Sequence, residues 1–288
     1  MHVLASARTP VQATPMEPCP STIDWNAHLE ALAAEHAPSY RDADPFAHAV
    51  IDDFLPPAML AAAIAGFPSA VDPIWQVFRT GAENLKGQSR DLARVDGALR
   101  AILEAANGAP FLGFLERLTG IAGLLGDDGY SGGGLHQTRR GGHLSLHVDY
   151  NYHPVTRWDR RLNALLYLNP DWDDDWGGHL ELWDADVTRC ARRIAPIANR
   201  HVVFSTGETS WHGHPSPLAA PADIVRRSIA TYYYSIGRPE EERAPDHNTV
   251  FRARPGEVLR RTPRERAGAA ARALGISRAR LRGLLPGG

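Results

Sequence analysis

Residues 141–150 have the sequence Gly-Gly-His-Leu-Ser-Leu-His-Val-Asp-Tyr, in which polar and apolar side chains alternate. This alternation predicts a β-strand, because side chains two residues apart in a strand point to the same side. His147 and Asp149 can therefore face one metal ion while Leu146 and Val148 face the core. The chain has 13 histidines, so the pattern His-x-Asp does not identify a metal site without further ligands.

A third candidate ligand follows about sixty residues later, in the run Ser-Trp-His-Gly-His-Pro at residues 210–215. Two histidines and one carboxylate on one face of a metal, with the other positions open, form the facial triad of non-haem Fe(II) oxygenases. The predicted metal ligands and catalytic residues are therefore His147, Asp149 and His212. His214 is a rival for the third position, because in an extended segment it lies on the same side as His212.

Composition and charge are typical of a globular protein. The chain has 288 residues, 43% of them hydrophobic, and a net charge of −2, so no overall field favours nucleic acid or an anionic membrane. Two cysteines, Cys19 and Cys190, are too few for a disulfide framework or a thiolate zinc site. Neither a long apolar run nor a signal-peptide pattern is present. We expect a cytoplasmic protein that binds neither membrane nor nucleic acid, and the sequence favours no oligomeric state.

Pattern and composition divide the chain into three parts. Residues 1–44 contain many proline and polar residues and predict a loose arm with one short helix, Trp25 to His36. Residues 45–238 are the predicted main domain, in which helical periodicity changes to short alternating runs over about residues 130–237. These runs predict a mainly β, sandwich or barrel-like fold with flanking helices, an α+β domain.

The third part, residues 239–288, is rich in arginine. Between Arg252 and Arg282 there are ten arginines and two glutamates, a local net charge of +8. Such a tail can bind anions or nucleic acid. It can also form solvated amphipathic helices with Leu259 and Leu274 on the apolar side. We predict the helical tail, because no aromatic residues are interleaved to stack on bases.

The segment from Gly132 to Gly237 resembles the Fe(II)- and 2-oxoglutarate-dependent dioxygenases of the prolyl-4-hydroxylase-like branch. The resemblance rests on motifs that follow the family's order and spacing, which are Gly142–Tyr150, Arg161–Asn169, Trp176–Trp183, Phe204–Pro215 and Arg226–Tyr234. It implies a double-stranded β-helix, a jelly roll of the cupin-like type, with flanking helices. It also implies Fe(II) as the metal, with 2-oxoglutarate and O₂ as co-substrates.

The resemblance further implies residues that bind 2-oxoglutarate. The far carboxylate of this co-substrate needs a fixed, bidentate cation, which a guanidinium group supplies. Arg226 and Ser228 match the family's Arg-x-Ser and share one face of a strand. Tyr167 matches a position that often reaches the same carboxylate, although a purely structural role in the core is also compatible with the pattern. His212 is preferred to His214, because the family places its third ligand before a glycine and near a proline.

The predicted function is hydroxylation of an unactivated C–H bond in a small molecule, such as an amino acid or natural-product intermediate, with release of succinate and CO₂. Asp149 favours hydroxylation over halogenation, because halogenating relatives have a small residue at this position. A protein side chain, as for the prolyl hydroxylases, is the alternative substrate. Two other hypotheses stay open at this point: a cupin-type metal enzyme that does not use 2-oxoglutarate, and a non-catalytic β-domain with a basic tail.

Overall fold

The structure is a computed structural model that describes residues 24–89, 91–95 and 97–259. Within these ranges no helix is long and apolar enough to cross a bilayer. The helices precede the main run of strands and begin at residues suited to helix starts, since an Asp24 oxygen accepts from two backbone N–H groups of the first turn and Pro57 starts the second helix. The described α-helices are α1 (Trp25–Tyr40), α2 (Pro57–Ala65), α3 (Gly97–Ala106) and α4 (Ala109–Thr119).

The strands and short 3₁₀ helices make up most of the remaining described structure. The 3₁₀ helices are η1 (Leu92–Arg94), η2 (Asp174–Trp176) and η3 (Glu240–Glu242). The described strands are β1 (His48–Ile51), β2 (Trp75–Arg79), β3 (Glu83–Ser89), β4 (Gly134–Val148), β5 (Asp159–Tyr167), β6 (Leu180–Trp183), β7 (Cys190–Ile194), β8 (His201–Ser205), β9 (His212–His214), β10 (Arg226–Ser235) and β11 (Val250–Phe251).

All the strand pairings are antiparallel, and the long strand β4 connects the two halves of the curled sheet. The main strand order is β1-β8-β5-β10-β4-β9-β6-β7, with β3 and β11 also paired to β4. Residues 134–138 of β4 pair with β10, whereas residues 144–147 pair with β9. This arrangement confirms the expected double-stranded β-helix with flanking helices.

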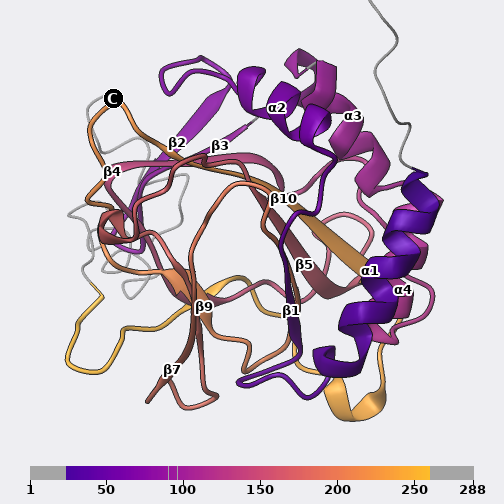
Figure 1. The fold of residues 1–288 in the computed structure, drawn as a ribbon. Coiled ribbons are helices and arrows are strands. Elements are labelled where there is room, and N and C mark those ends of the chain that lie inside the picture. The colour runs from indigo at the N-terminus through magenta and orange to yellow at the C-terminus, as the bar shows by residue number, and fades with distance from the viewer. Residues whose placement is uncertain (1–23, 90, 96, 260–288) are drawn as a thin grey trace, which may run out of the picture.

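Strand alternation separates two apolar layers. Ala164, Leu166 and Ile229 belong to the large core beneath the helices, which gather on one side of the sheet (Figure 1). Tyr167 and Val202 belong to a second cluster on the opposite side of these strands, between the two halves of the sheet. Each of the strands β5, β8 and β10 therefore presents one face to the helices and the other to the interior of the jelly roll.

The short helix predicted in the N-terminal arm is confirmed, but it is packed on the main domain and is not part of a loose segment. Helix α1 continues to Tyr40, beyond the predicted end at His36, and buries Leu29 and Ala33 in the main core. The hydroxyl of Tyr40 lies 3.0 Å from Ser205 Oγ, so the end of this helix is tied to the sheet. The segment forms a packed helix despite its polar composition, because its apolar residues recur at helical spacing and are buried together. The rest of the predicted arm, residues 1–23, lies outside the described residues.

The predicted helical tail also differs from the described structure. Residues 239–259 contain the short helix η3 and the strand β11, and residues 252–259 are not helical. Arg252 donates a backbone hydrogen bond to Leu146, so the chain after β11 stays beside β4. Pairing with β4 satisfies the backbone hydrogen-bonding groups of this segment. The composition of the segment alone did not indicate this pairing. Residues 260–288 lie outside the described residues.

Candidate active site

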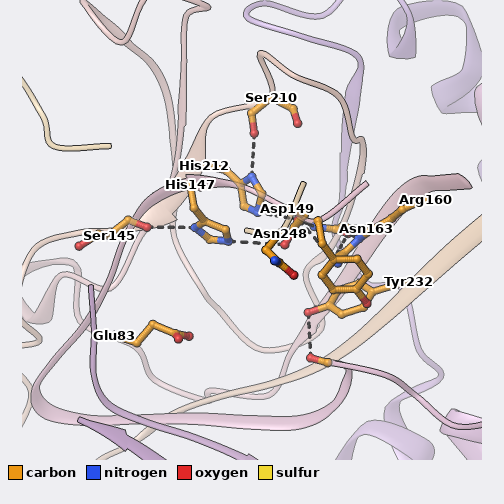
Figure 2. Close-up of polar contacts among 12 residues, drawn as sticks. Glu83, Ser145, His147, Asp149, Arg160, Asn163, Ser210, His212, Tyr232 and Asn248 are labelled. Atoms are coloured by element: carbon orange, nitrogen blue, oxygen red, sulfur yellow. Dashed lines mark hydrogen bonds and ion pairs between the residues drawn. The ribbon is translucent and has the colours of Figure 1, made fainter. Parts of the chain in front are cut away.

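The three predicted metal ligands lie together where β4 ends and β9 begins. His147 pairs across the two strands with His212, and Asp149 directly follows β4. His147 Nε2 is 3.7 Å from Asp149 Oδ1, and His212 Nε2 is 3.4 Å from Asp149 Oδ2. One ligand atom from each residue lies within 4.8 Å of the others. Figure 2 shows the two imidazoles beside the carboxylate, so the three groups can surround one ion.

Hydrogen bonds hold both imidazoles in the tautomer that a metal ion needs. Nδ1 of His147 donates to the carbonyl of Ser145 at 3.0 Å, and Nδ1 of His212 donates to the carbonyl of Ser210 at 2.8 Å. Because a carbonyl can only accept, the neutral form of each ring keeps its lone pair on Nε2. Burial and the neighbouring His212 lower the pKa of His147 to about 3, so this ring is neutral. Two imidazoles and one carboxylate are a donor set that fits Fe(II).

Two residues of β5 support the Asp149 carboxylate. Asn163 Nδ2 donates to Asp149 Oδ2 at 2.8 Å, and Arg160 Nη2 lies 3.2 Å from the same oxygen (Figure 2). Burial by itself would raise the pKa of Asp149, but Arg160 and His212 hold it well below its ordinary value. The carboxylate is therefore ionised. Neither supporting residue was predicted from the sequence.

Arg160 is a buried cation with one unused nitrogen. Its guanidinium carbon lies 3.7 Å from the ring centroid of Tyr232 and 4.4 Å from that of Tyr150. Nε and Nη2 both donate to Asn163 Oδ1, whereas Nη1 is buried and has no hydrogen-bond partner among the described residues. Arg160 also lines the pocket beside Asp149, so its charge contributes to the electrostatics of the pocket.

The structure separates His212 from its rival. His214 lies opposite Leu144 on β4, three residues before His147, and its Nε2 is 3.4 Å from Thr138 Oγ1. Among the described residues, the metal-ligating cluster does not include it. The glycine between the two histidines is required for this pairing, since a Cβ at residue 213 would lie 2.8 Å from two backbone oxygens of β4.

The pocket that contains this cluster also contains Arg226 and Ser228, and its volume is about 240 Å³. Arg226 is buried, with Nε donating to the carbonyl of Gly178 at 2.7 Å and Nη2 to the hydroxyl of Tyr167 at 3.2 Å. Gly178 has φ +70°, and a Cβ there would lie 3.1 Å from Arg226 Cδ, so a larger residue would disturb the cation. A guanidinium fixed in this way suits a carboxylate.

Tyr167 lies behind Arg226 and not among the residues that line the pocket. The side chain is fully buried and belongs to the apolar cluster between the two halves of the sheet. It holds Arg226 from behind through its hydroxyl, and the ring centroid lies 4.9 Å from the Arg226 guanidinium carbon. Ser228, in contrast, lines the pocket directly. The structure therefore gives Tyr167 an orienting contact with the cation.

The C-terminal segment completes one wall of the pocket, which the sequence analysis missed. Thr249 and Phe251 line the pocket, and β11 places Phe251 opposite His147 on β4. The rings of Phe251 and His147 have centroids 5.5 Å apart. A strand of two residues has too short a pattern to be recognised in a sequence.

Comparisons with known proteins agree with this geometry. Residues 133–234 match the family model described as the 2OG-Fe(II) oxygenase superfamily. A mouse (Mus musculus) protein named Prolyl 3-hydroxylase OGFOD1 is 34% identical over 86 residues, which are 28% of this chain and 15% of the relative. The chain thus covers less than a sixth of this relative's length.

Solved structures with a similar fold include two prolyl hydroxylases. One, from Trichoplax adhaerens, is in complex with a hypoxia inducible factor peptide; it has 16% identity and a TM-score of 0.53, over 75% of this chain and 94% of that chain. The other, a prolyl 4-hydroxylase from Phytophthora capsici, has 18% identity and a TM-score of 0.51, over 89% and 76%. At this identity the likeness concerns the fold. The family match favours an enzyme that uses 2-oxoglutarate over an enzyme without this co-substrate and over a non-catalytic domain.

Proposed function

Because residues 133–234 form a 2OG-Fe(II) oxygenase domain of the prolyl-hydroxylase-like type, we propose that the chain hydroxylates an unactivated C–H bond of a small molecule, such as an amino acid or natural-product intermediate. Succinate and CO₂ are the other products. The observation that carries the proposal is a single pocket lined by the cluster of His147, Asp149 and His212 and by Arg226 and Ser228. One pocket thus joins a metal-ligating set to a fixed cation.

Different residues of the pocket would bind the metal and the co-substrate. His147, Asp149 and His212 would hold Fe(II), which supplies the oxidising chemistry when 2-oxoglutarate and O₂ are bound. Arg226 and Ser228 would hold the far carboxylate of 2-oxoglutarate. Tyr167 and Gly178 keep Arg226 in place, so binding needs little reorganisation.

Two features of the pocket support a small substrate. The volume of about 240 Å³ lies below the usual range for ligand sites, so the pocket can take 2-oxoglutarate and a small reacting group. Arg160 lines the same pocket, with Nη2 3.2 Å from Asp149 Oδ2, and its positive charge favours a substrate that carries a carboxylate. An amino acid presents such a group close to its aliphatic C–H bonds.

Hydroxylation of a protein side chain is the second candidate. It is favoured by the similarity over 86 residues to a relative named as a prolyl 3-hydroxylase. A peptide carbonyl next to a proline ring is also attracted to the charge of Arg160. The two candidates differ in whether recognition extends along a chain outside the pocket.

The test combines metal binding with substrate screening. Protein loaded anaerobically with Fe(II) and 2-oxoglutarate is expected to show the weak visible metal-to-ligand charge-transfer band. Exposure to O₂ with a panel of free amino acids and proline-containing peptides then follows, with succinate and hydroxylated product measured by mass spectrometry. A hydroxylated free amino acid with a stoichiometric amount of succinate supports the proposal.

Three results decide against it. A folded, iron-loaded protein without the band contradicts 2-oxoglutarate binding at this site. Hydroxylation of peptides alone supports the second candidate. A chlorinated product in the presence of chloride contradicts the role of Asp149 in directing hydroxylation.

A further inference from the structure

The hairpin of β2 and β3 places an ion pair in the wall of the candidate active site. Glu83 and Lys86 both line the pocket, and Lys86 Nζ lies 2.9 Å from Glu83 Oε1. Strand β3 pairs with β4, with Glu83 opposite Leu144 and Lys86 opposite Thr138. Lys86 is the only lysine in the chain. Neither residue of the pair takes part in the proposed binding of the metal or the co-substrate.

An irregularity of the backbone brings the two side chains together. Residues three apart in a regular strand point to opposite faces, so Glu83 and Lys86 would be expected on different sides of β3. The register of β3 against β4 is interrupted between Asn84 and Lys86, and Leu85 has φ +49°, in the left-handed region that non-glycine residues rarely adopt. Backbone strain of this kind is often found at ligand sites. Here it accompanies the placement of both charges in one pocket.

The pair keeps hydrogen-bonding groups that a ligand can use. The side chains of Glu83 and Lys86 are 20% and 14% exposed, so both are accessible from the pocket that they line. Glu83 has a second carboxylate oxygen and Lys86 has two further N–H donors, and these have no hydrogen-bond partner among the described residues. Figure 2 shows the carboxylate of Glu83 directed into the site, below His147 in this view. Arg160, in contrast, is 1% exposed, so it acts on a ligand through its charge.

The opposite charges of the pair limit what it can bind. A dianion such as 2-oxoglutarate is attracted by Lys86 and repelled by Glu83, so the pair gives it little net stabilisation. A ligand with an ammonium and a carboxylate group close together can place the first against Glu83 and the second against Lys86. A free α-amino acid carries these two groups on one carbon atom. A residue within a peptide chain carries neither, so the charges of the pair would contribute little to its binding.

Apolar groups beside the pair indicate the character of the ligand's side chain. Phe78 on β2 lies opposite Lys86, and its ring centroid is 5.4 Å from Lys86 Nζ. Leu144 lies opposite Glu83 on β4, three residues before His147. Both apolar side chains line the pocket. These surroundings favour an aliphatic side chain, whose C–H bonds would lie in the same pocket as the metal-ligating cluster.

On the basis of the function proposed above, we propose that Glu83 and Lys86 recognise the α-ammonium and α-carboxylate groups of a free amino acid with an aliphatic side chain. This narrows the substrate of the candidate active site to one chemical class. The pair determines specificity, whereas Fe(II) and 2-oxoglutarate are bound by other residues of the same pocket.

Binding to the anaerobic complex tests the proposal without turnover. The full chain is loaded with Fe(II) and 2-oxoglutarate, and alanine, valine, leucine, isoleucine and proline are titrated while the charge-transfer band is monitored. At least one of them is expected to perturb the band saturably, because its side chain enters the pocket of the metal. Its N-acetyl and carboxamide derivatives each lack one charge and are expected to bind at least about 10-fold more weakly.

Variants that remove one charge assign each group of the ligand. Glu83→Gln should weaken binding of the free amino acid about 10-fold or more, but should not weaken binding of the analogue without the amino group. Lys86→Gln should likewise weaken binding of the free amino acid but not of its carboxamide. A purely structural role would affect both ligands equally. Arg100 and Glu104, an ion pair 2.7 Å apart on α3 outside the pocket, provide the controls Arg100→Gln and Glu104→Gln, which should leave all affinities unchanged.

Three results overturn the proposal. The first is that none of the amino acids binds to unmodified protein that shows the band, and the second is equal affinity for a free amino acid and its two derivatives. Both use the unmodified chain and do not depend on the folding of a variant. The third is a loss of 2-oxoglutarate affinity in folded Lys86→Gln, which would place Lys86 in the co-substrate site. In all three the band of the unmodified chain still supports the proposed function, whereas its absence contradicts that function and this assignment together.

Discussion

The two faces of β5 and β10 carry cavities of the same volume, about 240 Å³ each, with opposite chemistry. Asn163 and Ser228 line the front cavity, which holds a metal-ligating cluster and two arginines. Ala164 and Ile229, each one residue further along, line the back cavity, which has aromatic walls and one unpaired imidazole. A shift of one residue along either strand therefore leads from a polar, charged cavity wall to an apolar one.

The difference shows how the molecule treats buried polar groups. On the front face charges are paired with one another, as Asp149 is with Arg160, and the pairs are fixed by further hydrogen bonds. On the back face His201 avoids charge altogether and remains neutral. A charged ligand is compatible only with the first arrangement, since isolated charges are costly to bury.

The largest expected effect comes from removing a predicted metal ligand on the front face. His212→Ala should lower Fe(II) affinity more than about 100-fold, because the loss of a direct ligand exceeds the 10- to 100-fold cost of losing an outer partner. The matched variant His214→Gln should keep its iron. Iron content after dialysis and the charge-transfer band measure both. Retention of iron in the first variant, with loss in the second, would assign the ligand to His214.

The next effect separates co-substrate binding from metal binding. Arg226→Gln should raise the KM for 2-oxoglutarate about 10- to 100-fold, since a charge-assisted hydrogen bond contributes about 1.5–3 kcal/mol. Iron affinity should not change. Arg227→Gln is the control, because Arg227 is partly exposed and its guanidinium lies over the ring of Phe67. An unchanged KM in the first variant would place the cation elsewhere.

A smaller effect is expected from the outer support of Asp149. Asn163→Ala removes the hydrogen bond to Asp149 Oδ2 and should lower iron affinity or turnover about 10-fold. Asn26→Ala, at an exposed position of α1, should have no effect. The comparison uses iron titration and succinate formation, with melting temperature as a check on folding. Equal behaviour of the two variants would mean that Arg160 alone suffices to hold the carboxylate.

The smallest effect concerns the back face and is seen in the pH dependence of stability. His201 binds a proton more weakly in the folded state, with a pKa of about 3, than in the unfolded state at 6.5. The unfolded state therefore takes up the proton first, and stability falls as pH falls from about 6.5 toward 3, by up to about 1.4 kcal/mol per pH unit. His201→Leu should flatten this decline in urea unfolding of metal-free protein between pH 4 and 7. An unaltered slope would contradict a neutral, buried His201.

Much of the front face could be predicted from the local pattern of the sequence. Alternation around His147 and Asp149 predicted a strand with two ligand candidates on one side, and the structure has β4 there. The resemblance to a known family added the position of Arg226, which the structure places in the same pocket. The roles of these residues as ligands stay predictions, whereas their meeting in one pocket is a feature of the structure.

The features of the site that could not be predicted from the sequence depend on contacts between distant segments. Arg160 and Asn163 support Asp149 from a different strand, and Phe251 reaches His147 from a segment about a hundred residues later. No periodicity links such positions. The cavity beside His201 is likewise defined by helices and strands that are far apart in the chain.

By itself, the sequence determined the strand alternation, the order of the motifs and the candidate ligands, because these depend on spacing along the chain. Strand alternation alone did not distinguish His212 from His214, since both lie on one side of the same short strand, and the preference for His212 came from the resemblance to the family. Only the tertiary structure decided between them, because the register of β9 against β4 places His212 beside Asp149 and His214 opposite Leu144. Register depends on the whole sheet, and distances between segments arise only when the chain has folded.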